Sequence, residues 1–253
     1  MRNWMIAGNW KMHTTISDAR TLAAAVAEGT GGLDQGEVVI APPFTALSAV
    51  NEVIRGTRVS LAAQNMFYED KGAFTGEIAP SMLRDAGCAY VIIGHSERRK
   101  YFHETDETVN LKVKKCLTEG LKPIFCVGET LEEREQGVTE FVIGGQLKKG
   151  LYGVASLDNV VIAYEPVWAI GTGKTALPIE AEEVHRFIRQ LIADMYGDFD
   201  QNVRILYGGS VTGENIGDLI GMEDIDGGLV GGASLKAEGF LAIIKNAAEK
   251  KKC

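Results

Sequence analysis

The chain has 253 residues, of which 45% are hydrophobic and 24% are charged, and its formal net charge is −8. This composition is ordinary for a water-soluble protein, and the length allows a sizeable core. The negative balance disfavours a nucleic-acid partner, because phosphate backbones are bound by clustered Lys and Arg. No apolar run reaches the roughly 20 residues that span a bilayer, and no signal peptide is recognisable. We therefore expect a cytoplasmic protein with no membrane partner.

The four cysteines are spaced neither as CxxC pairs nor, together with histidines, as a zinc site. They are Cys88, Cys116, Cys126 and Cys253. We interpret them as reduced thiols, three of them packed in the core. We accordingly predict no metal and no cofactor.

Short apolar runs recur along the chain at similar intervals. They are continuous rather than alternating, which is typical of parallel strands that are covered on both faces. The eight predicted strands are Trp4–Ala7, Val38–Ala41, Val59–Ala63, Tyr90–Ile93, Ile124–Val127, Val160–Tyr164, Val203–Tyr207 and Leu229–Val230.

Helical patterns with readable ends lie between these runs. Ser17 or Asp18 is expected to cap a helix through Val26, and Pro178 is expected to begin a helix that Gly197 ends. Eight strand–helix units in about 250 residues predict an α/β fold, a single (β/α)₈ TIM barrel over residues 1–253. A doubly wound open sheet is the alternative, but no G-x-G-x-x-G follows an early strand.

In such a barrel, chemistry is expected at the carboxyl ends of the strands, where the loops toward the helices begin. Polar residues and glycines follow most of the predicted strands at this end. They are Asn9, Lys11, Gln64, Asn65, His95, Ser96, Glu97, Glu165, Gly208, Gly209, Ser210, Gly231 and Gly232. We predict that they converge on one rim.

Glu165 follows the sixth predicted strand, in the segment YEPVWAIGTGKT. Pro166 stops that strand because it has no N–H to donate, and Gly171 and Gly173 allow backbone angles that other residues avoid. A base at a strand end, followed by a loop that can cover it, suits proton transfer away from water. For this segment alone, an ordinary connection with a solvated glutamate is the alternative.

Lys11 and His95 are candidates for stabilising negative charge on a substrate. His95 lies between an apolar strand and a predicted short helix, whose N-terminal dipole disfavours the imidazolium form. It would then act as a neutral hydrogen-bond donor. Each residue also has a simpler interpretation, Lys11 as a surface lysine and His95 as a hydrogen-bonded core histidine.

Glycine pairs follow the last two predicted strands, in YGGS at Tyr207–Ser210 and GGAS at Gly231–Ser234. Backbone N–H groups there, with a helix start after Gly232, predict a phosphate cradle that needs no Lys or Arg. Barrels commonly bind phosphate at these two loops. Tight turns that merely require glycine are the alternative.

Seven segments, in order and on successive loops, carry a family resemblance over nearly the whole chain. They are AGNWKMH around Gly8, GAFTGE at Gly72–Glu77, GHSERR from Gly94, CVGETLEERE from Cys126, AYEPVWAIGTGK from Ala163, YGGSV from Tyr207 and VGGASL from Val230. In these segments the chain resembles the triosephosphate isomerase family. The resemblance implies interconversion of dihydroxyacetone phosphate and D-glyceraldehyde 3-phosphate through an enediol or enediolate intermediate.

The resemblance also implies roles for particular residues. Glu165 would be the base, His95 the electrophile that polarises the carbonyl, and Lys11 the group that offsets developing charge. The implied substrate-binding residues are Asn9, Lys11, Gly171, Ser210, Gly231 and Gly232.

A mobile lid, Pro166–Ala176, is implied by the same resemblance. Trp168 would pair with Glu129 while this lid is open. Glu97 would tether Lys11 rather than touch the substrate.

The segment Gln64–Ala79 is long for a barrel loop. In the family it projects into the other subunit of a homodimer, where Thr75 reaches the second active site, so we expect a homodimer. A floppy surface loop is the alternative for this segment.

Two other functions stay open on the residues alone. One is another phosphate-binding TIM-barrel enzyme, of amino-acid biosynthesis. The other is a catalytically idle barrel used for binding. The presence of Asn9, Lys11, His95 and Glu165 counts against the idle barrel.

Overall fold

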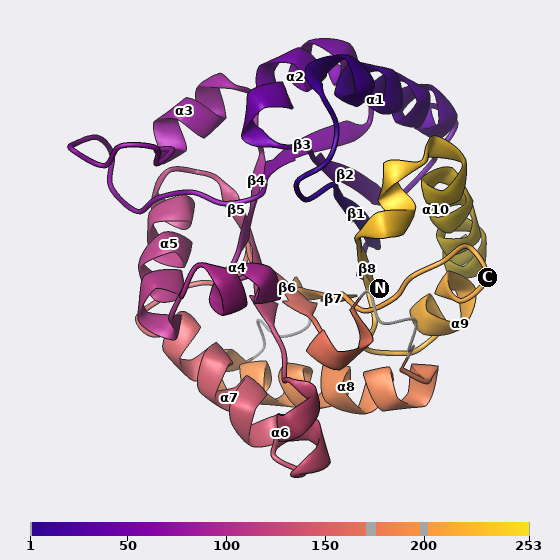
Figure 1. The fold of residues 1–253 in the computed structure, drawn as a ribbon. Coiled ribbons are helices and arrows are strands. Elements are labelled where there is room, and N and C mark those ends of the chain that lie inside the picture. Colours follow the sequence, from indigo (N-terminus) through magenta and orange to yellow (C-terminus); the bar gives the residue numbers. More distant parts are fainter. Residues whose placement is uncertain (1, 171–175, 198–201, 253) are drawn as a thin grey trace.

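A computed structural model describes residues 2–170, 176–197 and 202–252. Eight parallel strands pair in chain order, and β1 also pairs with β8, so the sheet closes into a barrel. Figure 1 shows the strands in a central ring with the helices around it. The strands are β1 Met5–Asn9, β2 Glu37–Ala41, β3 Val59–Ala63, β4 Tyr90–Ile93, β5 Lys122–Val127, β6 Val161–Tyr164, β7 Arg204–Tyr207 and β8 Gly227–Val230. The predicted barrel is confirmed.

The helices follow the strands around the outside of the barrel (Figure 1). They are α1 Ile16–Thr30, α2 Leu47–Ile54, α3 Pro80–Asp85, α4 Ser96–Tyr101, α5 Asp106–Thr118, α6 Leu131–Glu135, α7 Thr139–Gly150, α8 Pro178–Tyr196, α9 Ile216–Ile220 and α10 Ala237–Lys252, with 3₁₀ turns η1 Phe44–Ala46, η2 Val167–Ala169 and η4 Gly232–Leu235. As predicted, α8 begins at Pro178 and ends just before Gly197, whose φ is +68°.

The start of α1 differs from the prediction. Its cap is Thr15, not Ser17 or Asp18: the Thr15 hydroxyl accepts the Asp18 N–H (3.3 Å), and the Asp18 carboxylate accepts the Thr15 N–H (3.2 Å). This capping box satisfies two backbone donors at once, which a cap at Ser17 or Asp18 would leave open. The helix also continues past the predicted Val26 to Thr30.

Two hydrophobic clusters hold the barrel together. One fills its interior and includes Met5, Ala7, Cys126 and Leu206. The other lies between the strands and the helices and takes the alternate strand residues, such as Ile6. Because successive strand residues face opposite sides, continuous apolar runs supply both clusters at once. As predicted, three cysteines, Cys88, Cys116 and Cys126, are buried and free.

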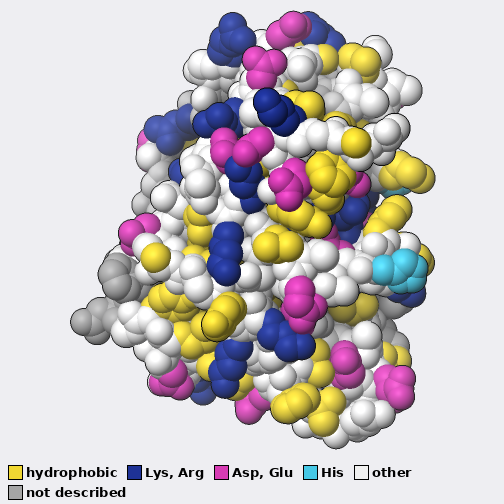
Figure 2. All heavy atoms as spheres, turned by 90° about the vertical axis from the view of Figure 1, so that its left-hand side faces the viewer, with side chains coloured by type: hydrophobic (Ala, Val, Ile, Leu, Met, Phe, Trp, Pro, Cys, Tyr) yellow, Lys and Arg dark blue, Asp and Glu magenta, His cyan; other side chains and the backbone are white. Residues whose placement is uncertain are grey.

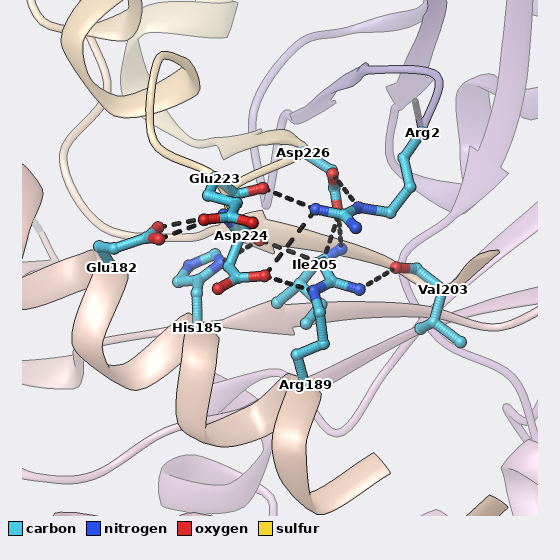
Figure 3. Close-up of polar contacts among 9 residues, drawn as sticks. All are labelled: Arg2, Glu182, His185, Arg189, Val203, Ile205, Glu223, Asp224 and Asp226. Carbon is cyan, nitrogen blue, oxygen red and sulfur yellow. Dashed lines mark hydrogen bonds and ion pairs between the residues drawn. The ribbon is translucent and has the colours of Figure 1, made fainter. Parts of the chain in front are cut away.

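An ion network lies at the amino ends of β1, β7 and β8, opposite the carboxyl ends of the strands (Figure 3). Arg189 of α8 donates from Nε to Asp224 Oδ1 (2.6 Å), from Nη2 to Asp226 Oδ2 (2.9 Å) and from Nη1 to the Val203 carbonyl (3.1 Å). Arg2 donates from Nε to Asp226 Oδ1 (2.7 Å). The network thus ties α8 and the chain start to this end of the barrel.

None of the described helices is both long and apolar enough to cross a membrane. Within residues 2–170, 176–197 and 202–252, no group of three or more His, Cys, Asp or Glu side chains is placed to hold a metal ion.

Candidate active site

A cavity of about 300 Å³ opens at the carboxyl ends of the strands. Its walls come from the loops after β1, β4, β6, β7 and β8, and the predicted residues among them are Asn9, Lys11, His95, Glu165, Gly208, Gly209, Ser210, Gly231 and Gly232. The predicted convergence on one rim is confirmed for these residues. Gly171, also expected there, lies outside the described residues.

Glu165 follows the last residue of β6, and its N–H donates to the Val127 carbonyl of β5 (2.8 Å). The residue is only 2% exposed. One carboxylate oxygen, Oε2, accepts the Ser96 N–H (2.9 Å), and the other, Oε1, lies 2.9 Å from His95 Nε2. The carboxylate is therefore buried and held by these two partners rather than solvated.

Space beside Glu165 requires glycine in the neighbouring loops. A Cβ added at Gly128 would lie 1.7 Å from the Glu165 carbonyl oxygen, and one at Gly208 would lie 2.9 Å from Glu165 Cγ. Any larger residue would displace the glutamate. Gly208 thus serves packing, whatever else its loop binds.

His95 is itself the N-cap of α4. Its Nδ1 accepts the Glu97 N–H (3.2 Å), so Nδ1 carries no proton. In the neutral ring the proton is then on Nε2, which faces Glu165 Oε1. Nε2–H is therefore the hydrogen-bond donor of the neutral ring.

The pKa values of this buried pair depend on their contact. Burial raises the pKa of Glu165. The adjacent His95 and the Ser96 N–H lower it by more, so the net direction is downward. Burial lowers the pKa of His95, whereas Glu165 raises it, and the net direction is upward. The sequence expectation considered only the helix dipole and not this opposing effect of Glu165, whereas the neutral ring that it predicted agrees with Nδ1 accepting the Glu97 N–H. Glu165 is held ionised, as a base must be.

Lys11 adopts the left-handed region, with φ +51°, which is uncommon outside glycine. Its N–H donates to Asn9 Oδ1 (3.0 Å), and its carbonyl accepts from Gln64 Nε2 (2.8 Å). Its ammonium donates to Glu97 Oε1 (2.6 Å), so the predicted tether is confirmed. Strain of this kind, about 1–3 kcal/mol, persists where surrounding contacts determine the backbone, and it clusters at functional sites.

The glycine loops after β7 and β8 face the same cavity. A Cβ at Gly209 would lie 2.2 Å from the Tyr207 hydroxyl, so this glycine leaves room for the Tyr207 side chain. A Cβ at Gly232 would meet nothing within 4 Å, and one at Gly231 would lie 3.5 Å from Lys11 Cε. The 3₁₀ turn η4 begins at Gly232, as the expected helix start there requires. Gly232 therefore borders open space, and the Lys11 side chain lies next to Gly231.

The described part of the expected lid is in contact with its surroundings. Trp168 Nε1 donates to Glu129 Oε1 (2.9 Å), the pairing expected of an open lid. The Arg134 guanidinium lies 4.7 Å from the centre of the Trp168 ring. Ser210 Oγ donates to the Ala169 carbonyl (3.0 Å). Residues 171–175 lie outside the described part of the chain.

Comparison with known proteins identifies the family of this site. The sequence matches the triosephosphate isomerase family over residues 4–247. The chain belongs to that family. It is an enzyme, an intramolecular isomerase that converts an aldose and a ketose into each other.

Relatives match the chain end to end. Triosephosphate isomerase of Prosthecochloris aestuarii is 57% identical over 252 residues, which are 99% of this chain and 100% of the relative. That of Chlorobium luteolum is 56% identical over 97% of this chain and 99% of the relative. The crystal structure of triosephosphate isomerase from Bartonella henselae superposes with a TM-score of 0.90 at 39% identity, covering 96% of this chain and 98% of the other.

Sequence reasoning missed two charged residues near the isomerase site, Arg99 and Glu104. Both bond the backbone of Gly94, the residue before His95. The segment SERRK contains three cationic residues, and nothing in the sequence distinguishes them. Only the fold shows which of the three side chains turns inward. The Ser96 N–H, which holds Glu165, carries no side-chain signal at all.

Proposed function

We propose that the chain interconverts dihydroxyacetone phosphate and D-glyceraldehyde 3-phosphate, with Glu165 as the base, His95 as the electrophile and Lys11 as the charge stabiliser. The observation that carries this assignment is the contact of Glu165 Oε1 with His95 Nε2 at 2.9 Å, in a cavity that Lys11 also lines. A buried base, a hydrogen-bond donor and a cation are what proton abstraction next to a carbonyl requires.

The reaction proceeds in two proton transfers. The Glu165 carboxylate removes a proton from the carbon next to the carbonyl, and the electron pair moves onto the carbonyl oxygen. His95 Nε2–H and the Lys11 ammonium stabilise that oxygen as negative charge develops. Glu165, now protonated, returns the proton to the neighbouring carbon, and the proton on the oxygens moves through His95.

The phosphate group is assigned to the backbone of the loops after β7 and β8. Gly231, Gly232 and Ser210 line the cavity, and Gly232 borders open space. Backbone N–H groups bind phosphate without a dedicated cation, so an acidic protein can still hold an anionic substrate. Asn9, Lys11 and Gly171 complete the proposed set of substrate-binding residues.

Incubation with substrate in D₂O tests the assignment. Deuterium should enter the product at the carbon next to the carbonyl, because the proton on Glu165 exchanges with solvent before it is returned. The label is located by NMR or mass spectrometry of the product. Turnover without deuterium would contradict abstraction by a base that exchanges its proton with solvent, and absence of turnover would contradict the proposed reaction altogether.

Residues 166–176 are proposed to close over the bound substrate. The Trp168–Glu129 hydrogen bond, near the start of this segment, supports an open position. Closure would have to break this bond. Deleting residues 170–174 should raise elimination of phosphate relative to isomerisation, because water then reaches the enediolate. Inorganic phosphate released per isomerised substrate measures this ratio, and a ratio equal to that of the full chain would contradict the lid.

We also propose that the chain forms one catalytic domain and works in the cytoplasm as a homodimer. Apolar side chains stand exposed on the rim and on the loop of residues 64–79, with Met12 94% and Phe74 43% exposed. Figure 2 shows the flank that carries α3, where hydrophobic side chains are spread over the surface among charged ones. Exposed apolar patches of this kind mark association sites.

Sedimentation equilibrium tests the homodimer directly. The chain should sediment with twice the mass of one copy, and Phe74→Asp should shift it toward one copy by placing a charge in the buried contact. A single-copy mass for the unaltered chain at micromolar concentration would contradict the proposal.

A further inference from the structure

Gly94 is the one residue between β4 and His95, and its geometry sets how His95 enters the cavity. Its φ is +75°, a conformation that favours glycine. A Cβ there would lie 3.2 Å from each of three atoms, in Arg99, Cys126 and Val109. The backbone before His95 is therefore both unusual and tightly enclosed.

Both polar groups of Gly94 are bonded to charged side chains. Its N–H donates to Glu104 Oε2 (3.2 Å), and its carbonyl accepts from Arg99 Nε (2.8 Å). The second oxygen of Glu104 accepts from Lys112 Nζ, so that buried carboxylate has its own counter-charge. The two peptide planes on either side of Gly94 are thus held by different ions.

Arg99 is bonded to three separate elements. Besides the Gly94 carbonyl, its Nη1 donates to Asp106 Oδ1 at the start of α5 (2.6 Å), and its Nη2 lies 3.4 Å from the Cys126 carbonyl of β5. A planar guanidinium directs donors from three separate nitrogens at acceptors in fixed directions, whereas an ammonium presents all its donors from one atom. Arg99 touches the peptide of His95 but not the cavity around Lys11.

We propose that Arg99 is a positioning residue for His95. By fixing the Gly94–His95 peptide plane, it directs Nε2 toward the position of the substrate oxygen, with Asp106 holding the guanidinium in place. The inference rests on the proposed role of His95 as electrophile. A side chain that merely stabilised the fold would not change the imidazole when the fold is intact.

The test compares Arg99→Met with Arg99→Lys, and with Lys100→Met as a matched control. Lys100 is exposed on the same short helix and also carries one positive charge. Arg99→Met should lower kcat by about 10- to 100-fold, since a displacement near 1 Å costs on the order of 10² in rate. KM should change by less than about threefold, because the phosphate loops are untouched. Lys100→Met should leave both constants unchanged.

The second readout is independent of turnover. In ¹⁵N-histidine-labelled protein, the Nδ1 and Nε2 shifts of His95 should move in Arg99→Met and move less in Arg99→Lys, which keeps a charge facing Asp106. If Arg99→Met does not fold, Arg99→Lys alone should show a partial shift and a partial loss of kcat.

Three results would overturn the positioning role: unchanged His95 shifts in a folded Arg99 variant, kcat within twofold of the unaltered enzyme, or a loss confined to KM. Failure of the proposed reaction is seen separately, as absence of deuterium transfer by the unaltered chain. A shift of the His95 signals in that inactive case would still support the positioning of the imidazole by Arg99.

Discussion

Replacing Glu165 by aspartate should lower kcat by about 10²-fold with the fold intact, because the shorter side chain withdraws the carboxylate by about 1 Å from the proton it must remove. In the unaltered chain, both carboxylate oxygens are already committed to fixed partners, the Ser96 N–H and His95 Nε2. A carboxylate held this way cannot recover the lost distance by moving freely. Steady-state kinetics in both directions measure the effect.

Two companion variants separate geometry from charge. Glu165→Gln keeps the length but removes the base, and general-base loss costs about 10²–10⁴ in rate, so it should be at least as damaging as the aspartate. Glu132→Asp shortens an exposed glutamate on α6 and should leave kcat unchanged. If Glu165→Asp kept kcat within about threefold of the unaltered enzyme, its role as the positioned base would be wrong.

The barrel and its rim could be predicted from sequence because their signals are local. Continuous apolar runs mark strands that are covered on both faces, and a residue that follows such a run lies at the rim by topology alone. This reasoning predicted, without any distance, that Lys11, His95 and Glu165 lie at the same rim. It works because a parallel barrel brings all strand ends to one side.

The remaining features of the site depend on pairings between distant segments. The upward direction of the His95 pKa comes from Glu165, which follows a different strand. The inward turn of Arg99 depends on Asp106 and the Cys126 carbonyl. The Thr15 cap was missed for a smaller reason, since Thr15, Ser17 and Asp18 are all good caps and only the reciprocal bonds distinguish them.

Charge is used differently at the two ends of the barrel. At the rim, Lys11 and Glu165 both line the open cavity, and each is also paired, with Glu97 and His95 respectively. At the other end, the buried ions of the Arg189 network contact one another directly (Figure 3). Only the first arrangement borders the cavity of the proposed reaction, so the second should matter for stability alone.

Arg189→Met should therefore destabilise the fold by about 3–5 kcal/mol while leaving kcat of the folded enzyme unchanged, because removing one partner leaves buried carboxylates uncompensated. Asp224 and Asp226 are both buried, and Arg2 remains near them to offset part of the loss. Urea unfolding at one fixed protein concentration measures the change, since the stability of an associating chain depends on concentration.

The matched control is Arg186→Met, which removes an exposed arginine from the same helix and should shift stability by no more than about 0.5 kcal/mol. Replacing Asp224 and Asp226 by asparagine in the Arg189→Met background should recover part of the loss, because neutral amides leave no unpaired charge behind. Equal stability of Arg189→Met and Arg186→Met would show that this network contributes nothing net. A fall in kcat of folded Arg189→Met would show instead that the two ends of the barrel are coupled.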